Sequence, residues 1–352
     1  MPAKILIDCE RMKYQHTGLY HYCYNLGKNL IENCNSQNEI LQFFLPKKVG
    51  PIFGKDEHYI HQKSWHKLLL PGTSQLNVWH ATHQDSDYYP QHRKVPVVLT
   101  IHDLNVLHNT SKTDFKKKRF IKEIGKKIDR ADHITFISSF TKDDVQQHFD
   151  LTNKPSTVIY NGCNIVEIKN PVAPLNAPNA SFYFTIGTIA EKKNFHVLPA
   201  LLVGNDRVLI IAGITQSEAY KQKIIQEAIK HRVEKRVIFT GPITDNDKQW
   251  YLKNCEAFVF PSLTEGFGLP VVEAMFFGKP VFLSACTSLP EIGGTVAYYF
   301  NSFEKDSMQL TVQQGLLHYH STAASESIKE RAAIFSWKEA ALKYLEVYRT
   351  LY

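Results

Sequence analysis

Residues 258–294 read FVFPSLTEGFGLPVVEAMFFGKPVFLSACTSLPEIGG, and this stretch predicts the fold. Its opening apolar run is typical of a buried strand, and a loop with Gly266 and Gly268 follows. Pro270 suits the first turn of a helix, where a missing N–H group costs nothing. A second strand is predicted from Pro280 to Ser284. Strand, glycine loop, helix and strand in this order indicate a parallel α/β sheet.

The loop between the first strand and the helix is a candidate ligand site. Backbone N–H groups at such a helix start, with the helix dipole behind them, attract phosphate. Two carboxylates, Glu265 and Glu273, frame the loop. Carboxylates accept hydrogen bonds from sugar hydroxyls, so the stretch fits a ligand that is part phosphate and part sugar. The simpler alternative for Glu273 is an acidic residue placed to suit the helix dipole.

Size and composition are those of a globular protein. The 352 residues leave room for two domains, and the content is 43% hydrophobic and 21% charged. No apolar run approaches the length of a membrane span, and the first residues predict a strand and not a signal peptide. The six cysteines include no C-x-x-C pair, which indicates neither a zinc site nor a disulfide framework. We therefore expect a cytoplasmic protein.

Strands and helices alternate along most of the chain. An apolar strand from Lys4 to Asp8 begins the first series, and a strand from Phe182 to Ile186 begins the second. A proline-rich segment without periodicity separates the two series. This alternation predicts two doubly wound, Rossmann-like domains, each built on a parallel sheet with its ligands beyond the carboxyl ends of the strands. The predicted bounds are 1–167 for the N-terminal domain, 168–180 for the linker, 181–327 for the C-terminal domain and 328–352 for a last helix.

The string EGFGLPVVEA, residues 265–274, resembles the signature of the retaining glycosyltransferases of the GT-B fold (glycosyl transferases group 1, family 4). The resemblance covers most of the chain; it is strongest from Phe182 to Gly294 and weakest over residues 33–77. It implies the GT-B architecture, in which two Rossmann-like domains face each other across a cleft. The last helix would pack back toward the N-terminal domain. The N-terminal domain would take the acceptor, and the C-terminal domain would bind the nucleotide sugar.

Two further segments carry the resemblance. GTIAEKKN, residues 187–194, is similar to the family's glycine–basic segment, whose lysine contacts the diphosphate. Lys193 takes this role by alignment, with Lys192 as the substitute. Many relatives have an arginine where this chain has Thr188, so one cation is missing. IHDL, which includes His102, resembles the segment whose histidine approaches the donor sugar.

The resemblance implies a set of site residues. The implied catalytic residues are His102, Glu265 and Lys193, with Glu265 contacting the transferred sugar. Glu273 would hold the ribose hydroxyls. The base would lie against the backbone near Gly241 to Ile243. The implied donor-binding residues are Gly18, Gly187, Thr188, Lys193, Gly241, Ile243, Glu265, Gly266, Phe267, Gly268, Leu269 and Glu273.

The reaction that the resemblance implies is transfer of a hexose-type sugar (mannose, glucose or N-acetylhexosamine) with retention of the anomeric configuration. The donor would be a GDP- or UDP-linked sugar, and the acceptor a hydroxyl of a glycan or lipid-linked saccharide in surface polysaccharide synthesis. Either a metal or fixed cations can stabilise the leaving diphosphate. The two Asp-x-Asp tripeptides, residues 85–87 and 245–247, are interpreted as solvated turns, so we expect no metal and no other cofactor. A nucleotide-sugar epimerase and a non-catalytic sugar-nucleotide-binding protein remain alternatives on the same fold.

A basic segment lies in the first half of the chain. Nine Lys or Arg residues stand against three acidic residues from Lys112 to Arg130, within a chain of net charge +7. Phe120, Ile121, Ile124 and Ile128 mark one apolar helix face. A solvated helix face is the common outcome of this pattern, and attraction to an anionic membrane surface or acceptor is the alternative. We expect a protein that touches the inner face of the membrane reversibly, and no nucleic-acid partner.

Overall fold

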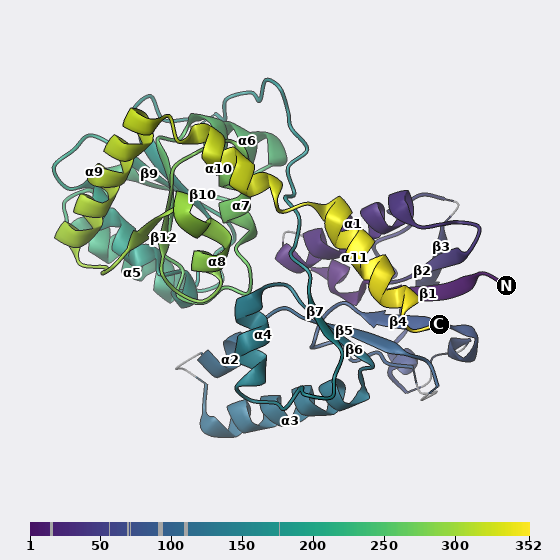
Figure 1. Cartoon of the computed structure of the whole chain (residues 1–352). Coiled ribbons are helices and arrows are strands. Elements are labelled where there is room, and N and C mark those ends of the chain that lie inside the picture. Colours follow the sequence, from purple (N-terminus) through teal and green to yellow (C-terminus); the bar gives the residue numbers. More distant parts are fainter. Residues whose placement is uncertain are drawn as a thin grey trace. The chain divides into compact units, whose positions relative to one another are not determined.

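The computed structural model describes residues 1–14, 17–55, 57–68, 70, 72–90, 94–108, 112–175 and 177–352 (Figure 1). The chain forms two compact units, one of residues 1–162 with 336–352 and one of residues 163–335. Each unit contains one parallel sheet, with seven strands in the first and six in the second. The prediction of two doubly wound parallel sheets is confirmed. Among the described residues, no helix is long and apolar enough to cross a membrane.

The sheet of the first unit has the order β3-β2-β1-β4-β5-β6-β7. The strand order reverses between β1 and β4, which is where doubly wound sheets bind ligands. The strands are β1 (Ala3–Asp8), β2 (Glu39–Leu45), β3 (His58–His61), β4 (Val78–Ala81), β5 (Val97–Ile101), β6 (His133–Phe136) and β7 (Ser156–Val158). The helices are α1 (Gly18–Asn33), α2 (Asn105–His108), α3 (Asp114–Arg130), α4 (Ser139–Gln146) and α11 (Trp337–Arg349), with 3-10 turns η1 (Glu10–Lys13), η2 (Ser64–Lys67) and η3 (Thr73–Gln75).

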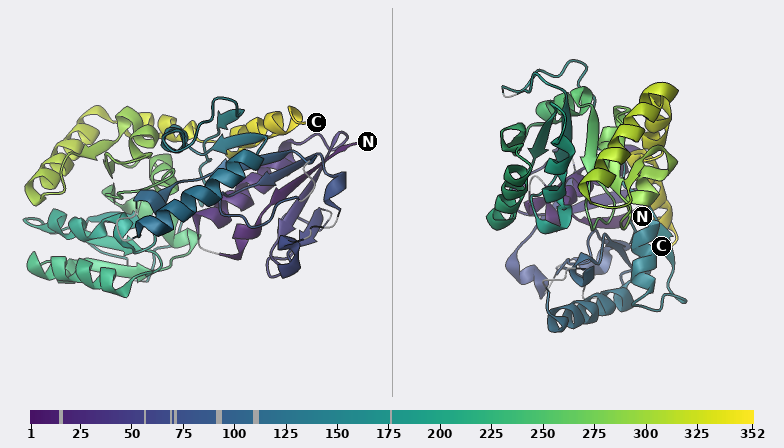
Figure 2. Two further views of the ribbon diagram at one scale, coloured as in Figure 1. Left: turned by 90° about the horizontal axis from the view of Figure 1, so that it is seen from below. Right: turned by 90° about the vertical axis from the view of Figure 1, so that its left-hand side faces the viewer.

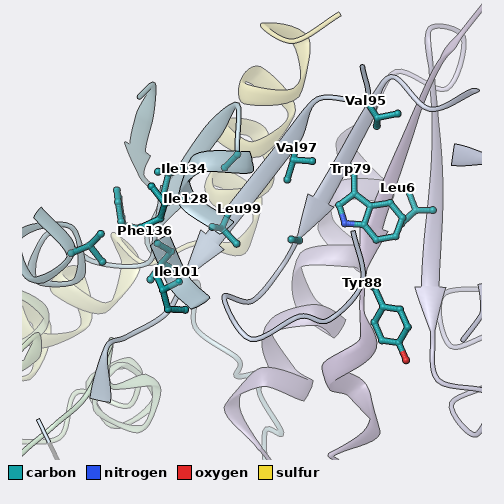
Figure 3. Close-up of a cluster of buried hydrophobic side chains, with 14 of the residues drawn as sticks. Leu6, Trp79, Tyr88, Val95, Val97, Leu99, Ile101, Ile128, Ile134 and Phe136 are labelled. Atoms are coloured by element: carbon teal, nitrogen blue, oxygen red, sulfur yellow. The ribbon is translucent and has the colours of Figure 1, made fainter. Parts of the chain in front are cut away.

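One face of this sheet carries the hydrophobic core shown in Figure 3. Side chains alternate between the two faces of a strand, so Val97, Leu99 and Ile101 of β5 all enter this core. Ile124 and Ile128 of α3 pack into the same cluster. The apolar face predicted for the basic segment is therefore the face that attaches α3 to the sheet.

The opposite face of the sheet is held by polar contacts to α11. Thr100 points away from the core cluster, and its Oγ1 lies 3.1 Å from the hydroxyl of Tyr344. The Tyr344 hydroxyl also lies 2.7 Å from that of Tyr22 on α1, and α1 and α11 pack side by side (Figure 1). The Tyr348 hydroxyl lies 2.7 Å from Nδ1 of His80 on β4. These contacts place the last helix of the chain in the first unit.

The second unit repeats the same topology with the order β10-β9-β8-β11-β12-β13. Figure 2 shows helices on both sides of this sheet. The strands are β8 (Phe182–Ile186), β9 (Val208–Ala212), β10 (Val237–Gly241), β11 (Ala257–Phe260), β12 (Val281–Ser284) and β13 (Tyr298–Phe300). The helices are α5 (Glu218–Lys230), α6 (Asp245–Asn254), α7 (Leu269–Phe276), α8 (Leu289–Gly293), α9 (Lys305–Thr322) and α10 (Ser325–Ala333), with 3-10 helices η4 (Glu191–Lys193), η5 (Phe195–Leu202), η6 (Glu234–Arg236) and η7 (Gly294–Val296).

The bounds of the units differ from the predicted domain bounds. The first unit ends at Gly162, and the described residues of the predicted linker belong to the second unit; residue 176 lies outside the described residues. The backbone N–H of Ile168 donates to the Gln249 side chain at 2.7 Å, and Val172 exchanges two hydrogen bonds with Asn246. The prolines led to the prediction of a linker, but side chains of α6 hold the backbone of this segment by hydrogen bonds.

The predicted last helix, 328–352, is two helices. α10 ends at Ala333 and lies in the second unit, whereas α11 begins at Trp337 and lies in the first. Ser336 separates them, because its hydroxyl accepts a hydrogen bond from the N–H of Glu339 and so caps the start of α11. The chain therefore passes between the units at residues 335–336 as well as at 162–163.

Candidate functional site

The loops after β8 and β11 meet at the point where the strand order of the second sheet reverses. β8 and β11 are neighbours although they are far apart in sequence. The N–H of Leu263 donates to the carbonyl of Lys192 at 2.8 Å, and the Ser262 hydroxyl oxygen lies 3.2 Å from the same carbonyl oxygen. The predicted glycine–basic segment and the Glu265 loop thus lie side by side at the carboxyl ends of the two central strands.

A buried ion pair joins these two loops. Nζ of Lys193 lies 2.5 Å from Oε1 of Glu265, and the Ser262 hydroxyl donates to the same oxygen at 2.5 Å. The side chains of Lys193 and Glu265 are only 10% and 13% exposed. Two of the three implied catalytic residues are therefore in direct contact.

Burial and charge act in opposite directions on this pair. Burial lowers the pKa of Lys193 below its usual value, and the nearby Glu265 only partly opposes this effect. Burial would raise the pKa of Glu265, but the charges of Lys193 and Lys192, together with the hydrogen bonds to Lys193 and Ser262, outweigh it and leave that pKa lowered. Glu265 is thus held as a carboxylate. With Oε1 engaged twice, its Oε2 is the oxygen left for a ligand hydroxyl.

The loop from Glu265 to Gly268 is fixed from the side of α8. The Ser288 hydroxyl contacts the carbonyl oxygens of Glu265 and Phe267, each at 3.0 Å. The N–H of Glu265 donates to Oγ1 of Thr287 at 3.0 Å. Gly268 has φ +106°, a conformation that favours glycine, and Leu269 and Pro270 then open α7. The loop is thus held rigidly at the helix start, as an anion site requires.

The Phe267 side chain is not part of an open site. It is 3% exposed, and its ring packs edge-on against Phe335 at 5.5 Å between centroids. Any contact of Phe267 with a ligand would come from its main chain, as the resemblance implies for Gly266 and Gly268.

Glu273 has a partner that the sequence analysis did not identify. Nζ of Lys248 on α6 lies 3.1 Å from Oε1 of Glu273 and 3.4 Å from Oδ1 of Asp245. Burial lowers the pKa of Lys248, but the two carboxylates outweigh burial and raise it above its usual value. Glu273 is thus more than a residue that suits a helix dipole. Local sequence patterns do not indicate that Lys248, the fourth residue of α6, pairs with Glu273, because the two residues lie 25 positions apart.

The remaining donor-side residues border the same edge. Gly187 follows β8, and a side chain there would come within 3.2 Å of Cε of Lys193. Thr188, next in the chain, is half-buried. Gly241 ends β10 with φ +70° and has nothing within 4 Å of the place of a side chain. Ile243 is half-buried just before α6.

The other two predicted residues lie in the first unit. Gly18 is exposed and begins α1, which Thr17 caps. His102 follows β5, and its Nε2 lies 2.8 Å from the carbonyl oxygen of Thr82. Burial lowers the pKa of His102 to about 4, so the ring is neutral near pH 7. A carbonyl only accepts, so Nε2 carries the proton and Nδ1 is an acceptor.

A polar cluster at the reversal point of the first sheet was not predicted. Burial raises the pKa of Asp8, at the end of β1, to about 7 despite hydrogen bonds from the Ser86 hydroxyl and the Glu10 N–H. Nη2 of Arg11 donates to the carbonyl of Asp85 at 2.7 Å. Within the first Asp-x-Asp tripeptide, the side chains of Asp85 and Asp87 are 48% and 61% exposed. The Ser86 hydroxyl between them is instead buried in its hydrogen bond to Asp8.

The second Asp-x-Asp tripeptide also has a structural role. Asp247 forms a reciprocal cap with Thr244 at the start of α6, and the Asp245 side chain is 76% exposed. Within the described residues, no group of three or more His, Cys, Asp or Glu side chains is arranged to hold a metal ion.

Two family models match consecutive parts of the chain. A model described as Glycosyltransferase Family 4 matches residues 47–167, and one described as Glycosyl transferases group 1 matches residues 168–295. The second match contains the Lys193–Glu265 and Lys248–Glu273 pairs.

Curated relatives include the O-antigen chain mannosyltransferase B of Escherichia coli, which is 24% identical over 282 residues covering 75% of this chain and 73% of the relative. The O-antigen chain mannosyltransferase RfbU of Salmonella typhimurium is 24% identical, covering 63% of this chain and 62% of the relative. The serotype-specific mannosyltransferase WbdA of Escherichia coli is 27% identical, but the chain spans only 32% of its length.

Solved structures share the fold. Sucrose-phosphate synthase from Thermosynechococcus elongatus superposes with a TM-score of 0.74 at 17% identity, covering 99% of both chains. Anabaena HepE in complex with UDP and glucose superposes with a TM-score of 0.68 at 15% identity, covering 99% of this chain and 100% of HepE.

Proposed function

Since this chain belongs to the glycosyltransferases of the GT-B fold, we propose that it moves a hexose from a nucleoside diphosphate sugar to a hydroxyl of a glycan or lipid-linked saccharide. We further propose that the transfer retains the anomeric configuration and needs no metal ion. The observation that carries the proposal is the buried Lys193–Glu265 pair beside the rigid Glu265–Gly268 loop. Mannose is the first sugar to test, because the curated relatives described above are mannosyltransferases. GDP and UDP are both candidate carriers.

The chemistry follows from what the two partners can do. The bond between the sugar C1 and the diphosphate oxygen breaks, and negative charge grows on the leaving diphosphate. Lys193 places a fixed positive charge there, and the N–H groups at the start of α7 add their dipoles. A bond from C1 to the acceptor oxygen forms on the same face of the sugar, and the acceptor proton passes to a phosphate oxygen. Oε2 of Glu265 orients the sugar by accepting from a hydroxyl.

A transfer assay tests this function. The protein is incubated with GDP-mannose, UDP-glucose or UDP-N-acetylglucosamine in the presence of a chelator, and free nucleoside diphosphate is measured. We expect slow release from one donor without any acceptor and faster release when a suitable saccharide is added. A glycosidic product of unchanged anomeric configuration supports retention.

Three outcomes would contradict the proposal. An altered sugar that stays attached to its nucleotide indicates an epimerase. Binding of every donor without release, across the acceptors tried, indicates a binding protein. Donor binding that disappears with the chelator contradicts metal independence.

We also propose that α3 touches an anionic membrane surface. Phe115 on its first turn is 77% exposed, and the side chains of Lys116, Lys118, Arg119 and Lys122 are exposed with it. Not every basic residue of the segment contributes. Nζ of Lys127 donates to the carbonyl of Gln84 at 2.6 Å, and Nη2 of Arg130 donates to that of Val95 at 2.7 Å. The surface available to a membrane is therefore the N-terminal part of α3.

Changing Lys116, Lys118, Arg119 and Lys122 together to glutamine should abolish sedimentation with vesicles that contain anionic lipid. Each basic residue near such a surface contributes about 1 kcal/mol, and salt screens this attraction. The matched control changes four exposed basic residues of the second unit, Lys223, Lys230, Arg232 and Lys235, to glutamine. Equal loss of binding in both variants would indicate a general charge effect, and a wild type that ignores anionic vesicles at low salt would contradict the proposal.

A further inference from the structure

The second unit contains two buried Lys–Glu pairs, and only one of them suits phosphate. At the Lys193–Glu265 pair the neighbouring Lys192 adds a second cation, so two positive charges face one negative charge. At the Lys248–Glu273 pair the neighbouring Asp245 adds a second carboxylate, so one positive charge faces two negative charges. A nucleoside diphosphate would therefore place its phosphates toward Lys193 and its uncharged part toward Lys248.

Stability alone does not explain the Lys248–Glu273 pair. Its side chains are 12% and 7% exposed. Removing two charges from water costs free energy that their attraction often only balances, and apolar residues of similar size can replace such a pair without loss. Glu273 lies on the helix that follows the anion loop, and Lys248 lies on the helix that follows the loop of Gly241. The pair therefore stands at the ligand-binding edge of the sheet.

The two groups together match a pair of neighbouring hydroxyls. The Lys248 ammonium has three N–H donors, of which Glu273 and Asp245 engage two, so one donor remains. Glu273 uses Oε1 for Lys248, so Oε2 remains as an acceptor. A hydroxyl can both donate and accept. One hydroxyl of a vicinal diol can donate to the carboxylate while the oxygen of the next one accepts from the ammonium.

We propose that Lys248 is a specificity-determining residue of the nucleotide site, which donates to the 2′-hydroxyl of the ribose while Glu273 accepts from the neighbouring 3′-hydroxyl. This inference rests on the proposed function, because it assumes that the second unit binds a nucleoside diphosphate. The site would therefore bind a ribonucleotide more tightly than the matching 2′-deoxyribonucleotide. In this arrangement Lys248 has two roles: it contacts the ligand directly, and its ion pair keeps Glu273 in place.

Calorimetric titration of the whole protein with UDP, GDP and their 2′-deoxy forms tests this role. For whichever base binds, the wild type should prefer the ribose form by roughly tenfold or more, because a 2′-deoxyribose lacks the hydroxyl that accepts from Lys248 and so leaves a buried donor unpaired. Lys248→Met should bring this ratio close to one by weakening the ribose form.

Two matched variants separate recognition from general damage. Lys193→Met removes the lysine of the other buried pair and should weaken ribose and deoxyribose forms equally, so the ratio stays as in the wild type. Lys253→Met removes a lysine at the end of the same helix, where it holds Glu167 and the carbonyl of Ile168, and should change neither affinity nor ratio.

A second variant covers the case in which Lys248→Met does not fold. Lys248→Met leaves the Glu273 carboxylate buried without its cation, so the double variant Lys248→Met/Glu273→Gln, which removes both charges, serves as the folded alternative. Thermal unfolding establishes which variant is folded, and the ratio is read in that one. In Lys248→Met a ratio near one supports the inference, and the wild-type ratio overturns it. In the double variant the ratio is compared with that of Glu273→Gln alone: a lower ratio supports the inference, and an equal ratio overturns it. A wild type that binds none of the four nucleotides contradicts the proposed function itself, which is a distinct result.

Discussion

Lys193→Met is expected to lower kcat/KM for sugar transfer by about 10²–10³-fold, the usual effect of removing one preorganised donor from a developing oxyanion. The Lys193 ammonium is buried beside Glu265 and held by the loop that Ser262 and Leu263 fasten to Lys192. The measurement is steady-state release of nucleoside diphosphate with a saturating acceptor.

Lys192→Met is the matched control for this prediction. Lys192 is exposed, and it is the carbonyl oxygen of Lys192 that contacts the Leu263 N–H and the Ser262 hydroxyl. Its loss should therefore cost much less than the loss of Lys193. An equal or larger effect at Lys192 would move the diphosphate contact to that residue. Because Lys193→Met leaves a buried carboxylate without its cation, unfolding curves of both variants are needed to show that the loss lies in the chemistry.

Gly213→Ala should destabilise the second unit by about 3 kcal/mol or more and weaken nucleotide binding with it. Gly213 has φ +130°, and a Cβ atom there would come 2.1 Å from the carbonyl oxygen of Gly187. Its N–H donates to the carbonyl of Gly241 at 2.8 Å. The change would push apart the two segments that border the proposed nucleotide site, and urea unfolding together with calorimetric titration with UDP and GDP measures both effects.

Gly204→Ala provides the comparison for Gly213→Ala. Gly204 also has a positive φ, +79°, but nothing lies within 4 Å of the place of its side chain. Its free energy of unfolding should fall by only about 1 kcal/mol, the cost of holding alanine at a positive φ, and its nucleotide affinity should stay the same. Similar losses in the two variants would show that backbone strain, and not the contact with Gly187, determines the cost.

Several elements could not be read from local sequence patterns. β3, with the sequence HYIH, has no buried apolar pattern because it is an edge strand, and β13 has only three residues. Apolar residues from Phe195 to Leu202 are spaced as in an α-helix, but the segment is a 3-10 helix, η5, which contains Pro199. Proline removes a backbone donor and clashes with the preceding turn, so the regular helical spacing of apolar residues was misleading there.

The sequence by itself determined the two doubly wound sheets and the position of the glycine loop before α7. These features depend on short-range chemistry: apolar runs bury as parallel strands, Gly268 permits a positive φ, and Pro270 starts a helix. The same local patterns, together with the resemblance they carry, located Glu265, Glu273 and Lys193 at one edge of one sheet.

Only the tertiary structure decided which charges meet. Lys193 and Glu265 are 72 positions apart and Lys248 and Glu273 are 25 apart, so no local spacing signals either pair. The state of His102, with its protonated Nε2 on the Thr82 carbonyl, depends in the same way on burial between strands. Strand order brings such residues together, and burial then sets the pKa of each group, because desolvation and neighbouring charge act through space and not along the chain.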